Sequence, residues 1–447
     1  MKAGFISLGC SKNLIDTEVM LGLLQQAGIE VSPDPAEADI LIVNTCAFIE
    51  SAKEEAITTV LSMAEYKNEG VGKCRALIVA GCLSQRYGQQ LLDEMPEADA
   101  VIGTGACDRI MEAVEEVLSG RRVIIVGEDK LLYNAETPRI VTTAPYTAYL
   151  KIAEGCNNRC AFCAIPLIRG QLRSRPIEDI VAEAKRLTEK GVREIILLAQ
   201  DTASYGKDLY GEPKLAALLT ELCKLEKLDW VRTLYSYPRF FNDELIETIA
   251  REPKIVKYVD LPLQHGDDTV LRNMRRPDTN EGMRSLIKKL REKIPGVCIR
   301  STFIVGFPGE TEEQYRTLRN FVEDMRFDKL GVFTYSREED TPAYDMPNQV
   351  EEAVMEDRYH DLMALQSKIS EETNQSLIGK ELSVLVEGRD VDDDGQEKNV
   401  VYGRSYREAP DVDGSVYVEG DEDSQPGDII SVRVAAGFAY DVVTERI

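Results

Sequence analysis

Three cysteines stand within eight residues in the segment Cys156-Asn-Asn-Arg-Cys160-Ala-Phe-Cys163, directly after the apolar run AYLKIAEG. Thiolates packed this closely can bind one face of an iron–sulfur cube. The alternative, a zinc site, needs a fourth ligand, and no nearby His or Cys supplies one. Three ligands on a four-iron cluster leave one iron open to another molecule. We therefore predict a [4Fe-4S] cluster held by Cys156, Cys160 and Cys163.

A second set of cysteines follows apolar runs in the N-terminal part of the chain. Cys10, Cys46 and Cys82 lie 36 residues apart, each immediately after GFISLG, LIVNT or LIVAG. The carboxyl ends of parallel strands meet at one sheet edge, where ligands usually bind. We predict that these thiols hold a second [4Fe-4S] cluster; the alternative is three separately buried cysteines. The remaining four are predicted to be core or surface thiols: Cys74, Cys107, Cys223 and Cys298.

The pattern of apolar runs divides the 447 residues into three parts. Residues 1–137 alternate short strands with amphipathic helices, which predicts a parallel α/β sheet domain. After a linker, residues 138–375 contain six strands separated by helical segments, which predicts a partial (βα)6 TIM-like barrel. Residues 376–447 carry short alternating strands between Asp/Gly turns, which predicts a small OB-like β-barrel. The predicted fold class is therefore multidomain α/β.

Composition excludes several classes of chemistry. The chain has two histidines, which argues against Ser-His-Asp triads and His-rich zinc centres, and it has no P-loop motif. No apolar run approaches the ~20 residues of a membrane span, and the N-terminus shows no secretory signal. Ten cysteines without an export signal predict a cytoplasmic protein whose cysteines are metal ligands or core residues. The formal charge of −25 does not steer the chain toward nucleic acid.

Together the motifs resemble a known family. The spacing of Cys156, Cys160 and Cys163 is similar to that of the radical S-adenosylmethionine superfamily. The N-terminal domain resembles that of the methylthiotransferases in the segments Leu8-Gly9-Cys10-Ser11-Lys12-Asn13, Asn44-Thr45-Cys46 and Gly81-Cys82. The same three-domain order, ending in a TRAM-like module, extends the resemblance over essentially the whole chain. Within the family, the segments 8–16 and 149–156 are most similar to the branch that modifies an aspartate of ribosomal protein S12.

The resemblance implies a mechanism and further site residues. The iron that the three cysteines leave open binds the amino and carboxylate groups of S-adenosylmethionine, whose reductive cleavage gives a 5′-deoxyadenosyl radical. A second S-adenosylmethionine methylates sulfur held at the N-terminal cluster. The radical removes hydrogen from the β-carbon of the target aspartate, which then joins the methylated sulfur. The resemblance also assigns cofactor binding to Phe162, Gln200, Gln264 and Gly306; taken singly, the last three could equally be strand caps or turn residues.

Charge bears on the choice of partner. From Ser376 onward the chain has 17 acidic and 7 basic side chains, a net charge of −10, whereas a module that holds tRNA should be basic. We therefore expect ribosomal protein S12 as partner, free or in the small ribosomal subunit, together with an electron donor protein, and neither a membrane nor a direct tRNA substrate. A merely solvated acidic face is the alternative interpretation of the charge. Two other functions stay open: a tRNA adenosine methylthiotransferase, and a non-catalytic iron–sulfur sensor or ribosome-binding module.

One position departs from the family pattern. Glu339-Asp340-Thr341 stands where the family commonly has Glu-Gly-Thr. Aspartate adopts a positive φ less freely than glycine does, so the geometry of this loop is in doubt.

Overall fold

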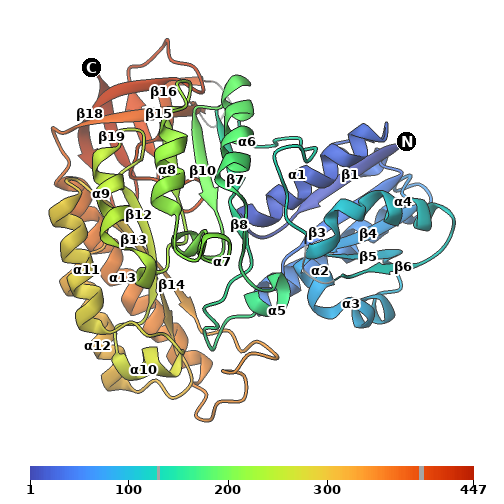
Figure 1. The fold of residues 1–447 in the computed structure, drawn as a ribbon, viewed down its shortest axis with the longest axis horizontal. Coiled ribbons are helices and arrows are strands. Elements are labelled where there is room, and N and C mark those ends of the chain that lie inside the picture. The colour runs from blue at the N-terminus through green and yellow to red at the C-terminus, as the bar shows by residue number, and fades with distance from the viewer. Residues whose placement is uncertain (128–130, 392–396) are drawn as a thin grey trace.

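The computed structural model describes residues 1–127, 131–391 and 397–447 (Figure 1). It confirms the predicted α/β class, with a parallel sheet, a TIM-like barrel and a small closed β-barrel in chain order. In Figure 1 the N-terminal sheet domain lies beside the TIM-like barrel, and the C-terminal β-barrel lies at one end of it. Within the described ranges, no helix is both long and apolar enough to cross a membrane. The domain boundaries after residues 137 and 375 stay predictions.

The N-terminal domain is built on a six-stranded parallel sheet in the order β2-β1-β3-β4-β5-β6. Its strands are β1 (Lys2–Ser7), β2 (Glu30–Val31), β3 (Ile40–Thr45), β4 (Ala76–Gly81), β5 (Ala100–Gly103) and β6 (Val123–Ile125). Every residue of β3 and β4 is buried, as expected for central strands covered on both faces. The sequence did not predict β2 and β5, because β2 spans two residues and β5 is short and partly built from Ala and Gly.

Helices cover both faces of this sheet. They are α1 (Ser11–Gln26), α2 (Glu50–Ala64), α3 (Cys82–Glu94) and α4 (Ile110–Leu118). The side chains of α1 and α4 pack with Ile40 and Ile42, whereas those of α2 and α3 pack with Leu41 and Val43. Helix α3 was missed in the sequence, where Gly88 interrupts the apolar pattern; this residue has non-helical φ/ψ angles.

The TIM-like barrel has the six predicted parallel strands, in the order β7-β10-β11-β12-β13-β14. They are β7 (Thr147–Lys151), β10 (Glu194–Leu198), β11 (Trp230–Thr233), β12 (Tyr258–Gln264), β13 (Cys298–Val305) and β14 (Lys329–Thr334). Two three-stranded ladders meet where Val231 on β11 bridges Ile255 before β12. No ladder joins β7 to β14 in the described chain, so the barrel is open. The predicted first strand is split, and β8 (Ala153–Glu154) pairs with β9 (Arg173–Ser174) instead.

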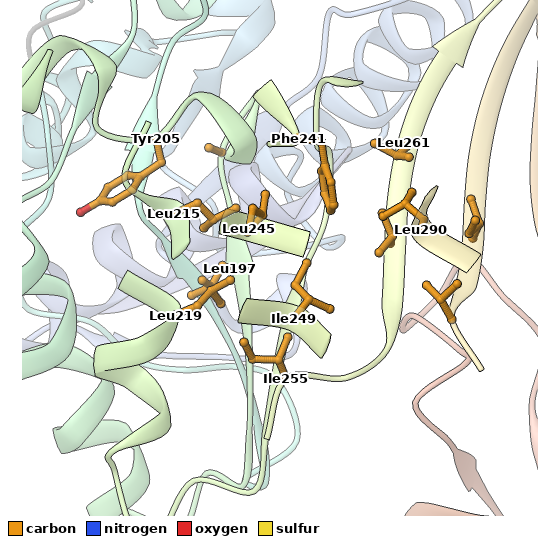
Figure 2. Close-up of a cluster of buried hydrophobic side chains, with 14 of the residues drawn as sticks. Leu197, Tyr205, Leu215, Leu219, Phe241, Leu245, Ile249, Ile255, Leu261 and Leu290 are labelled. Carbon is orange, nitrogen blue, oxygen red and sulfur yellow. The ribbon is translucent and has the colours of Figure 1, made fainter. Parts of the chain in front are cut away.

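The largest apolar core lies between these strands and the outer helices. Those helices are α6 (Ile177–Glu189), α8 (Leu215–Cys223), α9 (Asp243–Arg251), α11 (Asn280–Lys293), α12 (Glu312–Met325) and α13 (Glu352–Gln375). Figure 2 shows part of this core, where Leu219 on α8 and Ile249 on α9 lie beside Leu197 on β10. Burial of each such side chain stabilises the fold by about 1.5–3 kcal/mol.

Helix α1 of the N-terminal domain packs against the inner wall of the open barrel. Its Ile15 and Val19 are buried with Tyr149 on β7 and with Ile196 and Leu198 on β10. The segment before β7 also contacts α1, since Arg139 pairs with Glu18 at 2.6 Å. The N-terminal domain is therefore packed into the barrel, and the linker is part of this interface.

The C-terminal part is a closed five-stranded barrel in the order β15-β16-β17-β19-β18, as predicted. Its strands are β15 (Glu381–Val391), β16 (Glu397–Arg404), β17 (Val416–Glu419), β18 (Ile429–Gly437) and β19 (Val442–Arg446). It packs against the amino ends of the TIM-like strands: Arg404 pairs with Glu194 at the start of β10, and Asp413 accepts a hydrogen bond from Tyr258 at the start of β12. The predicted site residues lie at the opposite, carboxyl ends.

Candidate active site

Cys10, Cys46 and Cys82 all lie at the carboxyl edge of the N-terminal sheet. Cys10 precedes α1, Cys46 follows β3, and Cys82 is the first residue of α3. Cys10 is exposed to solvent, whereas Cys46 and Cys82 are buried. A Cβ placed on Gly9 would lie 2.8 Å from the Cys46 Cβ, so only a glycine lets the segment before Cys10 pass this close to Cys46.

Asn13 connects the three segments that carry these cysteines. Its buried side-chain amide donates to the carbonyl of Leu8 at 3.1 Å and to the carbonyl of Thr45 at 2.8 Å. Its carbonyl oxygen lies 3.5 Å from the Cys82 sulfur. One amide therefore fixes the approach to Cys10 and Cys46 and also contacts the Cys82 thiol.

Two cations set the electrostatics of this edge. Desolvation works to raise the pKa of Cys10, but the charges of Lys12 and Arg169 outweigh it and the pKa is lowered. Burial raises the pKa of Cys82 to about 12, against the attraction of Arg169. The neighbouring thiolates Cys46 and Cys10 add to the rise at Cys82. Ionisation of one of these thiols therefore makes ionisation of its neighbours less favourable. The positive charges of Lys12 and Arg169, by contrast, favour an anionic group at this edge.

The second trio lies in the loop after β8. The Cys163 amide donates to the Cys160 carbonyl at 3.1 Å, and the Asn158 amide lies 3.5 Å from the Cys156 sulfur. Burial is the main cause of the raised pKa of each thiol, and it brings that of Cys156 to about 11. The loop begins at Gly155, whose φ is +79° and where a Cβ would lie 2.1 Å from the Gln171 carbonyl oxygen. Any other residue there would displace the loop.

A buried charge network lies between the two trios. Arg169, at the end of α5 (Ile165–Arg169), donates to Asp16 at 2.7 Å and lies 3.6 Å from the Cys82 sulfur. It also reaches Glu154 at 3.3 Å, beside the second trio. Lys151 lies between the same two carboxylates, 2.6 Å from Asp16 and 2.7 Å from Glu154. These four side chains are buried, and the two cations balance the two carboxylates.

Gln200 extends this network to the carboxyl end of β10. Its amide nitrogen donates to Glu154 at 2.5 Å, and its buried amide oxygen has no partner among the described residues. Burial opposes ionisation of Glu154, but Lys151 and Arg169 hold the pKa of this carboxyl below its usual range. This unpartnered buried oxygen, on a side chain hydrogen-bonded to Glu154 two residues before Cys156, is suited to accept a hydrogen bond from a ligand.

The other predicted cofactor residues surround the same barrel end. Gln264 ends β12 with a φ of +72°, and the Gly306 amide donates to Glu310 at 2.9 Å. Phe162 packs on an apolar cluster that includes Phe307, so the cysteine loop and the Gly306 turn are in contact. Glu310 itself is held by Arg358 at 2.8 Å. The ligand and cofactor roles of all ten predicted residues stay predictions.

The N-terminal domain also contacts the far side of the barrel mouth. Arg86 on α3 pairs with Glu338 after β14 at 2.6 Å, and the amide of Glu50 on α2 donates to Ser336 at 3.2 Å. The Lys12 ammonium lies 3.5 Å from the ring centroid of Tyr235, at the carboxyl end of β11. The edge that carries Cys10, Cys46 and Cys82 therefore faces the barrel end that carries the second trio.

Each trio offers the donor set of an iron–sulfur cube, in which each thiolate binds a different iron. Among the described residues, no three Cys, His, Asp or Glu side chains surround a single metal ion. Three soft thiol donors and nearby positive charge fit an anionic iron–sulfur cube better than a lone hard cation.

Asn13, Lys151 and Glu154 lie in segments that carried the family resemblance, but no role was predicted for them, and Arg169 was not singled out at all. Lys151 and Glu154 lie in the otherwise apolar run before Cys156, and a charged residue in such a run is a signal that could have indicated a buried ion pair. Nothing in the sequence indicates that their partner Asp16 comes from the other domain.

Comparison with known proteins places this geometry in a family. The chain is 52% identical over 443 residues to the ribosomal protein uS12 methylthiotransferase RimO of Desulforamulus reducens, covering 99% of this chain and 98% of that one. It is 48% identical to the protein of the same name from Acetivibrio thermocellus, covering 100% and 98%. The chain belongs to the RimO family.

Family models match all three parts of this RimO family member. The match to the radical SAM superfamily spans residues 150–322, that to uncharacterized protein family UPF0004 spans residues 2–103, and that to the TRAM domain spans residues 378–447. Among solved structures, the radical S-adenosylmethionine methyltransferase TsrM from Kitasatospora setae has a TM-score of 0.55 at 14% identity, covering 77% of this chain and 75% of that one. That likeness concerns the fold alone.

Proposed function

We propose that this protein is a radical S-adenosylmethionine methylthiotransferase that adds a methylthio group to the β-carbon of an aspartate of ribosomal protein S12. Its family relatives carry the name of that activity on uS12. The observation that carries the proposal is Arg169, which contacts Cys82 of the N-terminal trio and, through Glu154, reaches Gln200 beside the second trio. Two cysteine trios that lie on facing edges and are linked by one buried network suit a reaction that joins a carbon radical to a methylated sulfur.

Each trio has its own part in this proposal. Cys156, Cys160 and Cys163 would hold a [4Fe-4S] cluster that binds and reductively cleaves S-adenosylmethionine, supplying a 5′-deoxyadenosyl radical. Cys10, Cys46 and Cys82 would hold a second [4Fe-4S] cluster that presents the sulfur to be methylated. Phe162, Gln200, Gln264 and Gly306 would bind S-adenosylmethionine.

The chain's own residues would position these parts and exclude water. Asn13 fixes the three N-terminal thiol segments relative to one another. Arg169 and Lys151 pair with Asp16 and Glu154, so each of these buried charges between the trios has a partner of opposite sign. Apolar packing of Ile15 and Val19 against the barrel keeps this wall closed to solvent. Such enclosure protects a radical from side reactions.

Charge supports the choice of S12 as substrate. The net charge of −25 suits a cationic ribosomal protein and disfavours a direct tRNA substrate. We expect the protein in the cytoplasm, with a protein electron donor, and S12 as its partner either free or in the small ribosomal subunit.

Metal content tests the two trios directly. The anaerobically reconstituted protein should bind about eight irons, and the Cys10/Cys46/Cys82→Ala variant about four, on the basis of two four-iron cubes. The variant Cys223→Ala, at a half-buried thiol outside both trios, serves as control and should keep the wild-type iron and sulfide content. Equal iron contents in wild type and triple variant would contradict a second cluster.

Product analysis separates the candidate functions. Reduced enzyme is incubated with S-adenosylmethionine and with either S12 or tRNA, and the added CH3S group is located by mass spectrometry. Modified tRNA with unmodified S12 would favour the tRNA methylthiotransferase. Two clusters without 5′-deoxyadenosine would favour a non-catalytic iron–sulfur sensor or ribosome-binding module.

A further inference from the structure

A basic cavity lies beside the Cys156–Cys163 loop, and neither the N-terminal cysteines nor the Arg169 network is among the residues that line it. Its volume is about 490 Å³, and its wall includes five cationic side chains: Lys207, Arg239, Arg272, Arg275 and Arg276. They come from the loops and short helices α7 (Lys207–Tyr210) and α10 (Asp268–Asn273) that follow β10, β11 and β12. The cavity is therefore at the carboxyl end of the barrel, the same end as the Cys156–Cys163 loop.

Most of this positive charge has no internal partner. Lys207, Arg239, Arg272 and Arg275 are exposed, and no ion pair to any of the four is found in the part of the chain that the structure describes. The ring of Phe240 contacts two of them. The Lys207 ammonium lies 4.1 Å and the Arg239 guanidinium 5.8 Å from its centroid. The chain as a whole has a net charge of −25, so this cluster is a positively charged region on an acidic protein.

The cavity wall touches the second cysteine trio. Arg276 is buried, stacks 4.2 Å from the Tyr237 ring and lies 3.9 Å from the Cys160 sulfur. Asn158, on the same wall, contacts the Cys156 sulfur through its backbone amide. Single side chains therefore separate the cavity from the thiols that would bind the cluster.

We propose that this cavity and its basic rim are the docking site for a small acidic redox protein that delivers electrons to the cluster at Cys156, Cys160 and Cys163. The inference rests on the proposed function. In each transfer one electron leaves the partner's reduced cofactor, which is oxidised by one unit, and enters the cluster; no proton or covalent bond is exchanged. That electron is the one consumed in reductive cleavage of S-adenosylmethionine.

The chemistry of the site favours this partner over the other two macromolecules considered. S12 is cationic and would be repelled by the four exposed positive charges, whereas Arg276 is paired with Asp278 at 3.1 Å. An RNA backbone would be attracted by them, but its binding has no need of contact with the cysteine loop, which Arg276 provides here. Charge-steered, weak encounters at a short distance from the redox centre are typical of electron-transfer complexes.

The test combines binding with two reductants. Lys207→Glu/Arg239→Glu/Arg272→Glu reverses three exposed charges of the rim and leaves Arg275 and Arg276 intact. The control Lys185→Glu/Lys224→Glu/Lys288→Glu reverses three charges on other helices, whose side chains are 66%, 63% and 78% exposed. Binding of a bacterial flavodoxin to each full-length protein is measured by calorimetry at low and high salt. Formation of 5′-deoxyadenosine is measured with flavodoxin hydroquinone and, separately, with dithionite.

We expect the rim variant to weaken flavodoxin binding and to raise the flavodoxin concentration needed for half-maximal rate, each about 10-fold or more, as loss of charge complementarity does. Wild-type binding should weaken as salt rises. Dithionite-driven formation should be the same in wild type, rim variant and control, because dithionite needs no docking site.

Other results would overturn the inference. Equal flavodoxin binding by rim variant and control would show that the rim is not the docking site. Binding of an RNA oligonucleotide that depends on the rim, with flavodoxin binding unchanged, would assign the cavity to nucleic acid instead. Absence of 5′-deoxyadenosine even with dithionite would contradict the proposed function, and the calorimetric result would still decide whether the rim binds flavodoxin.

Discussion

Arg169 is the residue on which the arrangement of the two trios most depends. Its guanidinium contacts Asp16 and Asn13 of the N-terminal domain, Glu154 of the barrel, and the Cys82 sulfur. Only arginine has enough donors in a rigid fork to serve four groups at once. Because the site is buried, loss of Arg169 would leave Lys151 as the only cation paired with both Asp16 and Glu154.

We expect Arg169→Gln to lower the free energy of unfolding by about 3 kcal/mol or more, because Lys151 alone would face two buried carboxylates. The measurement is the urea unfolding midpoint followed by circular dichroism. Arg186→Gln is the control: Arg186 is 45% exposed and pairs with Glu136 at 3.4 Å, so its loss should change stability by less than about 1 kcal/mol. Equal effects of the two substitutions would mean that the network is not stabilising.

Asp340 occupies a backbone conformation that the family pattern assigns to glycine. Its φ is +62°, so this aspartate adopts the left-handed backbone conformation in place of the family's usual glycine. We expect Asp340→Gly to preserve stability within about 1 kcal/mol and Asp340→Val to lower it by about 1–2 kcal/mol, since a β-branched side chain is strained at this φ. Thermal unfolding measures both. Asp345→Val, at an exposed position without positive φ, should have an effect below about 0.5 kcal/mol.

At the scale of elements, the turn from β4 into α3 fixes Cys82. Gly81 has a φ of +96°, and a Cβ there would lie 2.3 Å from the Asn44 side-chain oxygen. Gly120, after α4, has a φ of +83° with nothing within 4 Å of such a Cβ. The two glycines share a positive φ and differ in steric crowding.

We expect Gly120→Ala to cost about 1 kcal/mol and Gly81→Ala about 2–4 kcal/mol, because a side chain at position 81 meets both a clash and a backbone conformation (φ +96°, ψ −149°) that essentially only glycine adopts. Gly81→Ala should also lower iron content toward that of Cys10/Cys46/Cys82→Ala, because Cys82 is displaced. Denaturant unfolding and iron analysis measure the two effects. Identical stabilities of the two variants would show that crowding around Gly81 is relieved without cost.

The same elements show how far the sequence could predict the structure. Strands buried on both faces, such as β3 and β4, are continuous apolar runs and were predicted, as were all six barrel strands. The two-residue β2 and the Gly-interrupted α3 lack a periodic signal and were missed. Both trios were recognisable from spacing, whereas Arg169 and Asn13 act through tertiary contacts that no local pattern encodes.

For the whole molecule, the C-terminal barrel is joined to the TIM-like barrel by buried charge. Glu194 lies between Arg404 at 2.7 Å and Arg232 at 2.9 Å. Burial would raise the pKa of Glu194, but the two arginines lower it to about 2. The ion pair between Glu194 on β10 and Arg404 on β16 joins the two barrels. The ionisation state of the Glu194 carboxylate therefore affects how firmly the C-terminal barrel is attached.

The lowered pKa predicts an acid-dependent loss of stability. Glu194 contributes fully above its unfolded pKa of about 4.5, and the contribution of about 3 kcal/mol is lost as pH falls from there toward 2. The unfolding free energy of wild type minus that of Glu194→Gln, measured by urea titration between pH 6 and 3, should therefore shrink as pH falls. A difference that is constant with pH would contradict this assignment.

Helix α1 begins directly after Cys10 and packs against the inner wall of the open barrel. The distance between the two cysteine trios therefore depends on how this helix packs against the barrel. The segment that joins the domains supports this position, since its Arg139 pairs with Glu18 on the same helix. A shift of α1 by a single turn would move Cys10 about 5 Å along the helix axis, so the distance between the two sets of cysteines is only as rigid as the packing of α1 against the barrel.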